Sequence, residues 1–199
     1  LDLEELDIIG ASFCAKEKEA FYVDLRNDSL REFFFIKFKK FLRENKKLIG
    51  QNMKFDYKVL KKYGITMKTV FFDTMIAAML CGYEGEKLSM DDLAEKYLRY
   101  KTVHYEDIVK DKNKNLADYP VEQVKDYSCE DADITFRLYN FYKPKIVENG
   151  FEKLFYDIEM PLLPILSEME LEGILIDRQY FEMLDKKVTT EIEKVKNDI

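Results

Sequence analysis

The chain has 199 residues, of which 47% are apolar and 14% aromatic, with seven glycines and four prolines. This composition excludes a disordered or fibrous protein, and the length allows one domain, or one domain and part of another. The 32 basic and 39 acidic residues give a net charge of −7, which disfavours non-specific nucleic-acid binding because such proteins usually carry a basic surface.

Short apolar runs alternate with polar turns through the first half of the chain and predict strands and helices in mixed order. Residues whose side chains can accept backbone hydrogen bonds mark the helix starts, namely Asp28, Ser29, Asn52 and Asp73. The predicted elements are a hairpin of strands at 8–14 and 20–25, helices at 29–44, 53–63 and 74–81, and strands at 48–50 and 70–72.

The second half is expected to be mainly helical. Ser89 resembles the start of a capping box for the helix that follows it. Pro120 suits the first turn of a long helix that ends near Tyr142, just before Pro144. The remaining elements are a proline-containing helix that leads to Gly173, a short strand at 174–176, and a charged helix capped by Asp177 that reaches residue 199.

A module boundary is expected near Asn149 and Gly150, because Pro161 and Pro164 in the next segment kink or end helices. The chain then divides into a domain at 1–149 and the start of a second module at 150–199. Strands mixed with helices predict a three-layer α/β or an α+β domain.

An aspartate interrupts the apolar face of the helix at 53–63. Met53, Asp56, Leu60 and Tyr63 follow the spacing of a buried helical stripe. An isolated buried carboxylate is expensive unless it is paired, protonated or bound to a metal. A position near the helix start offers a structural explanation, since the helix dipole stabilises a carboxylate there.

A second aspartate interrupts the long helix in the same way. Asp131 shares a stripe with Val124 and Leu138, and Tyr127 lies one turn before it. Two such aspartates on separate helices favour a shared hard cation such as Mg²⁺, which takes oxygen ligands and supports phosphoryl chemistry. A purely structural role for each remains the alternative.

Several segments resemble, in order, the 3′-5′ exonuclease domain of the family-A DNA polymerases. Residues 49–56 (IGQNMKFD) resemble its second motif, and residues 127–133 (YSCEDAD) its third. Residues 72–75 and 90–98 also look like family segments, and residues 158–177 are similar to the start of the polymerase module. The resemblance covers nearly the whole chain.

The resemblance implies a ribonuclease-H-like fold of the α/β class, in which helices flank a mixed central sheet. It implies a proofreading exonuclease of the Tyr-type DEDD superfamily, in which four carboxylates bind two divalent ions, Mg²⁺ or Mn²⁺. By position, Asp56 and Asp131 are the carboxylates of the second and third motifs, and Tyr127 orients the attacking water. Glu130 and Asp133 lie off the Asp131 stripe and are expected to face solvent.

Four further residues match family positions that contact the frayed 3′ strand. Gln51 and Asn52 belong to the second motif, Tyr105 matches an aromatic position near the terminal nucleotides, and Lys87 matches a basic one. Each also has a structural explanation, as a strand end, a helix cap, a loop anchor and a solvated charge. Asp73 matches the family as well, but a helix cap explains it without chemistry.

The family's first motif, an Asp-x-Glu on the opening strand, has no counterpart in the chain. Leu1 aligns just after that motif, and residues 8–14 match the next strand of the fold. Asp2-Leu3-Glu4 has the right spacing, but it lies downstream of the expected position in a polar, turn-like stretch. The 199 residues are therefore expected to lack the first strand and half of the metal ligands. Either an upstream part precedes them, or the protein is truncated, in which case negligible exonuclease activity and weak metal affinity are expected.

Two other functions remain open. A catalytically silent scaffold domain of a polymerase would keep the fold without the ligands, although Asp56, Tyr127 and Asp131 together speak against it. A related Tyr-type exonuclease acting on RNA would show a preference for the 2′-hydroxyl group, and the polymerase-like segment at 158–177 speaks against it.

The expected partners are a single-stranded DNA 3′ end, primer–template DNA and the rest of the polymerase polypeptide. A cytoplasmic protein is expected, because no signal peptide or membrane span is visible. A monomer is expected as well. Cys14, Cys81 and Cys129 are widely spaced and read as small buried residues in a reducing compartment.

Overall fold

The computed structural model describes residues 7–44, 47–67, 70–82, 85–111 and 113–197. Two compact units divide the chain at residues 1–168 and 169–199, and α7 runs across the division. The elements in chain order are β1 (Gly10–Lys16), β2 (Glu19–Asp24), α1 (Asp28–Arg43), β3 (Ile49–Gly50), α2 (Met53–Lys62), β4 (Phe72–Asp73), α3 (Thr74–Cys81), α4 (Met90–Leu93), the π-helix η1 (Ala94–Leu98), α5 (Tyr105–Ile108), the 3₁₀ helix η2 (Leu116–Asp118), α6 (Val121–Glu148), the π-helix η3 (Leu154–Glu159), α7 (Met160–Glu172) and α8 (Arg178–Asn197).

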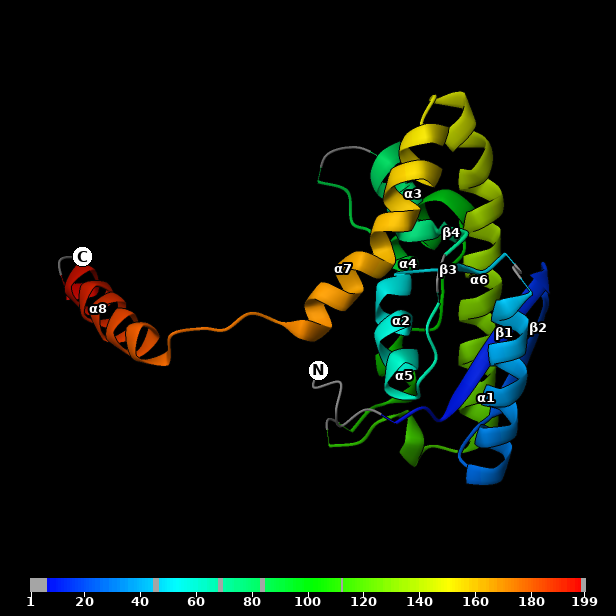
Figure 1. Ribbon diagram of the computed structural model, residues 1–199, viewed down its shortest axis with the longest axis horizontal. Helices are drawn as coiled ribbons and strands as arrows, with labels where there is room; N and C mark the ends of the chain where they lie inside the picture. Colours follow the sequence, from blue (N-terminus) through cyan, green and yellow to red (C-terminus); the bar gives the residue numbers. More distant parts are fainter. Residues whose placement is uncertain (1–6, 45–46, 68–69, 83–84, 112, 198–199) are drawn as a thin grey trace. The chain divides into compact units, whose positions relative to one another are not determined.

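The predicted hairpin is confirmed and is covered by a helix on each face (Figure 1). Successive side chains of a strand leave opposite faces. Phe13 of β1 contacts α1, where its ring centroid lies 6.0 Å from that of Phe34 and 6.1 Å from that of Phe38. The next residue, Cys14, points toward α6, where its Sγ lies 4.0 Å from an Asp133 carboxylate oxygen. The hairpin therefore joins α1 and α6 through its two faces.

A second, parallel sheet pairs β3 with β4, so that Ile49 lies opposite Phe72 and Gly50 opposite Asp73. In the described residues this sheet is separate from the hairpin. Helix α6 packs against β1, β2, β3 and α3 and is the central helix of the unit. The largest fully buried side chains of the unit include Phe72, Leu138, Tyr142 and Phe155. The mixed α/β class is confirmed.

The start of α1 differs from the prediction. Asn27, rather than Asp28 or Ser29, occupies the N-cap position, and its side chain accepts a hydrogen bond of 3.1 Å from the Leu30 N–H. Asp28 lies inside the first turn, where the positive end of the helix dipole stabilises its charge. The helix therefore begins one residue earlier than expected. Asn27 also has a side chain that can cap a helix, and the cap at this position leaves Asp28 for the first turn.

Helix α6 does not end before Pro144 but continues to Glu148. Tyr142 and Ile146, on either side of the proline, are both buried. Proline removes one backbone hydrogen bond, and burial of these side chains offsets that loss. The predicted strand at 174–176 is wrong, since these residues form no strand and are exposed.

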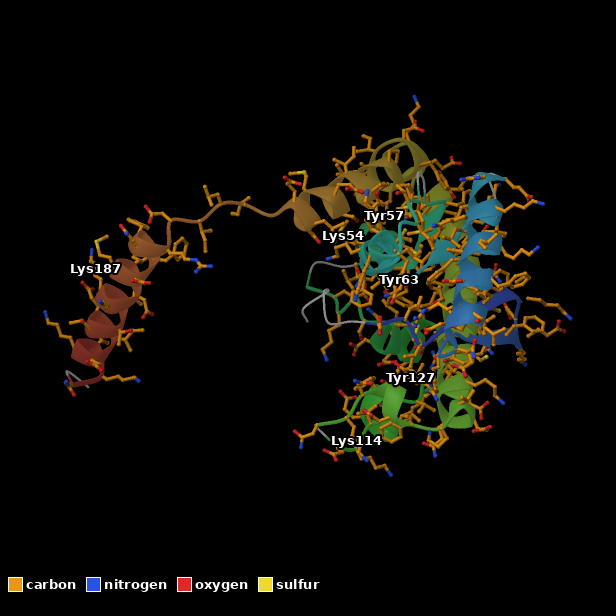
Figure 2. All side chains as sticks on the ribbon, turned by 60° about the horizontal axis from the view of Figure 1, so that its bottom comes forward. Lys54, Tyr57, Tyr63, Lys114, Tyr127 and Lys187 are labelled. Atoms are coloured by element: carbon orange, nitrogen blue, oxygen red, sulfur yellow. The ribbon has the colours of Figure 1, made fainter. Side chains whose placement is uncertain are left out.

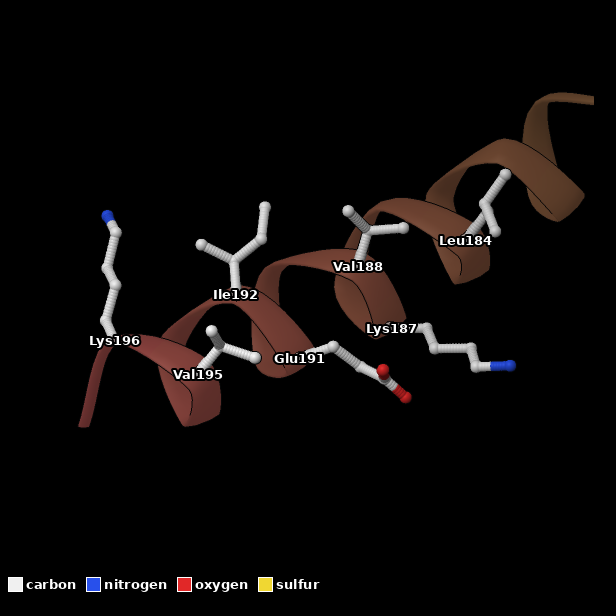
Figure 3. Close-up of a pocket in the computed structure, with 7 residues that line it drawn as sticks. All are labelled: Leu184, Lys187, Val188, Glu191, Ile192, Val195 and Lys196. Atoms are coloured by element: carbon white, nitrogen blue, oxygen red, sulfur yellow. The ribbon is translucent and has the colours of Figure 1, made fainter. Parts of the chain in front are cut away.

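In the second unit, α8 begins after Asp177, which caps it as predicted by accepting a 3.0 Å hydrogen bond from the Tyr180 N–H. A shallow hollow along one side of α8 is lined by apolar side chains at three- and four-residue spacing together with charged ones (Figure 3). The lining residues are Leu184, Lys187, Val188, Glu191, Ile192, Val195 and Lys196.

No helix in the described ranges is long and apolar enough to cross a membrane. Cys14, Cys81 and Cys129 carry free thiols and are half-buried, so the expectation of fully buried cysteines is only partly right. The module boundary near residue 150 stays a prediction, and the division into compact units falls later, after Glu168.

Candidate active site

Helix α6 carries Tyr127 (labelled in Figure 2). Asp131 follows one turn later, and this spacing places the two side chains on one face of the helix. The Tyr127 hydroxyl and the Asp131 carboxylate are close enough to shift each other's pKa. Burial and the nearby Asp131 charge raise the pKa of Tyr127 well above its ordinary value. The tyrosine therefore keeps its proton at neutral pH.

The Asp131 carboxylate is only partly satisfied. Its Oδ1 atom is buried and has no hydrogen-bond partner in the described part of the chain. Burial raises the pKa of Asp131 to about 7, the neighbouring Tyr127 hydroxyl opposes this shift, and the charges of Asp91 and Glu130 add to it. A buried carboxylate oxygen without a partner is costly, so this group fits a bound cation.

Asp56 lies in the first turn of α2. The predicted buried stripe is only partly right, because Met53 and Leu60 are buried whereas Asp56 keeps an exposed surface. The protein that surrounds its carboxyl on the other sides raises the pKa of Asp56 to about 7, and the charge of Asp73 contributes. Asp56 thus combines an exposed residue surface with a carboxyl whose charged form the protein disfavours, which also fits a cation.

Asp73 is buried and joins the starts of two helices. Its carboxylate accepts hydrogen bonds from Met75 N–H (2.9 Å) and Ile76 N–H (3.3 Å), and thereby caps α3 as predicted. It also accepts from Met53 N–H (2.7 Å) and Asn52 N–H (3.3 Å) at the start of α2. Burial raises the pKa of Asp73, and these four donors oppose the shift. The helix that carries Asp56 is therefore held at its start by Asp73.

Replacing Asp73 by alanine should lower the free energy of unfolding by at least about 2 kcal/mol, because two helix starts lose their cap. Urea unfolding followed by circular dichroism measures this change. The matched control is Asp92→Ala, which removes a carboxylate from α4 whose side chain is 40% exposed. Equal, small effects of the two substitutions would contradict the capping role of Asp73.

The structure brings Tyr127 and Asp131 together and places Asp56 near Asp73. Direct contact between Asp131 and Asp56 is not seen in the described residues, and no group of three or more His, Cys, Asp or Glu side chains there is arranged to hold a metal ion. The segment Asp2-Leu3-Glu4 lies outside the described residues.

The two polar residues before α2 have different environments. Gln51 donates a 2.9 Å hydrogen bond to the Leu88 carbonyl and accepts one from the Thr74 hydroxyl, so its side chain is fixed within the protein. Asn52 is exposed, and its backbone lies in the left-handed region with φ 54°. Its side chain makes no capping hydrogen bond to α2. The predicted cap by Asn52 is wrong because the Asp73 carboxylate already accepts the hydrogen bonds of the first N–H groups of α2.

The other two residues assigned to strand contacts are both exposed. Tyr105 begins α5 and is 40% exposed. Lys87 extends into solvent and its Nζ lies 3.6 Å from an Asp92 carboxylate oxygen. Their accessibility is compatible both with contacts to a strand and with the structural alternatives.

The expected solvent exposure of Glu130 and Asp133 is wrong. Glu130 is half-buried and accepts a 2.8 Å hydrogen bond from the Tyr100 hydroxyl. Asp133 is only 8% exposed, and it accepts hydrogen bonds from the Arg137 guanidinium and from the Lys18 N–H in the hairpin turn. Both faces of α6 are covered, because the hairpin and the segment after η1 pack against it.

Two residues near the site were missed by sequence reasoning. Asp91 accepts a 2.6 Å hydrogen bond from the Thr102 hydroxyl, and its other oxygen lies 3.1 Å from His104 Nδ1. It thereby ties the segment before Tyr105 to α4. Phe55, directly before Asp56, is 39% exposed and presents an aromatic surface beside that carboxyl. The available signal was an aromatic residue inside the motif at 49–56.

The chain is similar to known proteins over most or all of its length. Residues 2–146 match the family model described as 3′-5′ exonuclease. DNA polymerase I of Borreliella burgdorferi is 41% identical over 203 residues, which cover all of this chain and 22% of that protein. DNA polymerase I of Pseudomonas aeruginosa is 34% identical over 190 residues, which cover 89% of this chain and 21% of that protein. The chain spans about a fifth of the length of these curated relatives.

A solved structure shares the fold. It is described as the POL domain of Pol1 from M. smegmatis in complex with DNA primer-template and dNTP. The TM-score is 0.65 at 20% sequence identity, and the match covers 88% of this chain and 28% of that one. This similarity supports the α/β architecture.

Proposed function

Since the chain belongs to the 3′-5′ exonuclease family of the family-A DNA polymerases, we propose that it serves as the proofreading exonuclease region of such a polymerase. The reaction is hydrolysis of the last phosphodiester bond at a single-stranded DNA 3′ end, which releases a nucleoside 5′-monophosphate. The observation that carries the proposal is the Tyr127–Asp131 pair, with its unpartnered carboxylate oxygen.

Asp56 and Asp131 are proposed as ligands of two divalent ions, Mg²⁺ or Mn²⁺. These hard cations prefer carboxylate oxygens, and both carboxyls have a pKa raised to about 7, which a bound cation would lower. When bound, such ions stabilise charge on the attacking and leaving oxygens of an in-line displacement. Asp56 and Asp131 alone neutralise too little of the charge of two ions, so further carboxylate ligands are expected to complete the site.

Tyr127 is proposed to orient the attacking water. Its raised pKa keeps the hydroxyl protonated, so the group can donate and accept hydrogen bonds but cannot act as a general base near neutral pH. The neighbouring Asp131 carboxylate is an acceptor toward which the hydroxyl can turn its proton. Tyr127 is therefore proposed to position the water, while the carboxylates hold the charge.

The 3′ end of the strand is proposed to contact the exposed residues around these carboxyls, namely Asn52, Lys87 and Tyr105. Phe55 and Tyr105 offer aromatic surfaces, and stacking on such a surface contributes about 1–3 kcal/mol per base without selecting a sequence. Gln51, whose side-chain amide is bonded within the protein, would act mainly by fixing the turn before α2.

The finer fold assignment is also a proposal. Hairpin β1–β2 and the parallel pair β3–β4 both pack against α6. We propose that they belong to one ribonuclease-H-like sheet, in which a further strand, carrying an Asp-x-Glu motif, lies between β1 and β3. A crystal structure of the full-length protein would test this placement.

The segment after about residue 150 is proposed to begin the polymerase module. The apolar stripe of α8 in Figure 3 is then covered by the rest of the polymerase polypeptide. Primer–template DNA is the proposed partner of that polypeptide, and a monomer in the cytoplasm is the proposed state.

The test is metal-dependent digestion of a 5′-labelled single-stranded oligonucleotide by the full-length protein. We expect 5′-mononucleotides as products, loss of activity in EDTA, and little digestion of paired 3′ ends. Tyr127→Phe should lower kcat by about tenfold or more with little change in KM, because the ring remains and only the water-orienting hydroxyl is lost.

Different results would select the other candidates. Absence of metal-dependent digestion would favour the catalytically silent scaffold domain. Faster digestion of RNA than of DNA would favour the RNA-acting exonuclease. An unchanged kcat in Tyr127→Phe would contradict the role proposed for that hydroxyl.

A further inference from the structure

The outward face of α1 is apolar where a solvated helix would be polar. Leu30, Phe33 and Ile36 are 57%, 59% and 66% exposed, and Phe41 further along is 37% exposed. Their spacing places these side chains on one side of the helix, away from the core. Isolated exposed apolar residues are ordinary, but a contiguous group of them marks an interaction surface.

The fold itself does not require these outward residues. Phe34, Phe35 and Phe38 form the inward face of α1, where Phe34 and Phe38 stack at 5.5 Å between ring centroids and Phe35 lies 4.8 Å from Tyr63. These inward rings already fill the contact with the hairpin and the core. The outward apolar residues must therefore be explained by something other than core packing.

Positive charge is concentrated on the same face. Lys37, Lys40 and Arg43 are exposed and share the outward side with Phe33. Residues 37–47 contain six lysines and arginines and one acidic residue, in a chain whose net charge is −7. The Lys37 ammonium lies 5.0 Å from the centre of the Phe33 ring, so an aromatic surface and a cation are presented together.

We propose that this outward surface of α1, formed by Leu30, Phe33, Ile36, Lys37, Lys40, Phe41 and Arg43 and called here the α1 face, binds single-stranded DNA. Its cations neutralise backbone phosphates and Phe33 stacks against a base, which is how sequence-independent single-strand binding works. The inference rests on the proposed function, and it adds a DNA contact on a helix that carries none of the active-site residues.

A second copy of this chain could also bind an apolar face. The charge of the α1 face favours DNA over such a copy. A twofold contact between two copies would place the α1 face against itself and gather Lys37, Lys40 and Arg43 of both copies in one interface. Such like charges repel, whereas a phosphodiester backbone complements them. The same cations also explain how a chain of net negative charge could bind a DNA strand at a site other than its proposed metal ligands.

The test measures binding of a fluorescent oligonucleotide of about 30 nucleotides, longer than a single-domain site of about 16, to the full-length protein in EDTA. In the variant Lys37→Gln/Lys40→Gln/Arg43→Gln, the slope of log Kd against log salt should fall by about 2, because each single-strand phosphate contact contributes about 0.7. Phe33→Ala should weaken binding by about fivefold or more at fixed salt. Crosslinking of an iodouracil-substituted strand should label the peptide that contains Phe33.

The matched control replaces three exposed lysines on other elements, Lys16, Lys125 and Lys153, by glutamine. It changes the net charge equally and should leave the salt slope nearly unchanged. Equal slopes for the α1-face variant and this control, or the absence of any crosslink to α1, would overturn the proposal. Concentration-dependent dimers that Phe33→Ala abolishes, with unchanged DNA binding, would overturn it in favour of self-association.

The nuclease rate separates this proposal from the function on which it rests. The α1-face variant should keep kcat within about twofold of wild type while KM rises, since the face binds the strand and leaves the chemistry to α2 and α6. If the salt slope is unaffected while nuclease activity remains sensitive to Tyr127→Phe, only the α1 face is rejected. If the slope changes but the protein has no nuclease activity, only the proposed function fails.

Discussion

Replacing Asp131 by alanine in the full-length protein should lower the rate of single-stranded 3′-end hydrolysis by at least about 10³-fold. The carboxylate would supply charge to a bound cation, whose stabilisation of the transition state amounts to several kcal/mol, and each 1.36 kcal/mol is a factor of ten. The substitution also removes the carboxylate that neighbours the Tyr127 hydroxyl. Single-turnover release of mononucleotides at saturating Mg²⁺ measures the change.

The same substitution should leave the fold intact. At pH 8, above its raised pKa of about 7, the Asp131 carboxyl is charged in the folded protein, and burial disfavours that charge relative to the unfolded chain. Alanine removes this penalty, so the urea midpoint should stay the same or rise. Asp126→Ala, on an exposed position of the same helix, is the matched control and should keep the full rate. An Asp131→Ala protein that is folded and fully active would contradict the assignment.

Replacing Asp133 by alanine should lower the free energy of unfolding by about 3–5 kcal/mol, with little direct effect on the chemistry. Asp133 pairs with Arg137 in a largely buried contact, with side chains 11% and 19% exposed. It also accepts the Lys18 N–H of the hairpin turn. Its removal leaves a buried guanidinium without its carboxylate, which is the costly way to break such a pair. Equilibrium urea unfolding measures the loss.

A double substitution separates two contributions to the lost stability, the missing Asp133–Arg137 pair and the buried Arg137 charge that is left without a carboxylate. Asp133→Ala/Arg137→Met removes both charges and should recover most of the stability lost in the single variant. Glu19→Ala, which breaks the exposed pair with Lys16, should cost less than about 1 kcal/mol. If the double variant is no more stable than Asp133→Ala, the stranded Arg137 charge is not the cause.

The parts of the site that sequence predicts well depend on local spacing. Tyr127 and Asp131 are four residues apart, which brings them together in any regular helix. Asp73 is followed directly by a helix, so its capping role is visible from the chain alone. The hairpin is predicted in the same way, by two β-rich runs around a charged turn.

The features that sequence missed depend on contacts between distant elements. Asn52 has the chemistry of a cap, but Asp73 supplies the acceptor from β4. Asp133 appeared to face solvent because the hairpin turn that covers it is far away in sequence. Pro144 stays within α6 because packing of Tyr142 and Ile146 outweighs a lost hydrogen bond. In each case tertiary packing overrode a correct local preference.

The shared cap at Asp73 has a consequence for the order of folding. The first N–H groups of α2 are satisfied by a carboxylate 20 and 21 residues downstream, so α2 has no local cap of its own in the described residues. The N–H groups of Asn52 and Met53 meet this acceptor only after β4 has paired with β3 and brought Asp73 into place. The turn that carries Asp56 is therefore expected to be ordered late, and the position of this carboxylate to depend on a sheet that must form first.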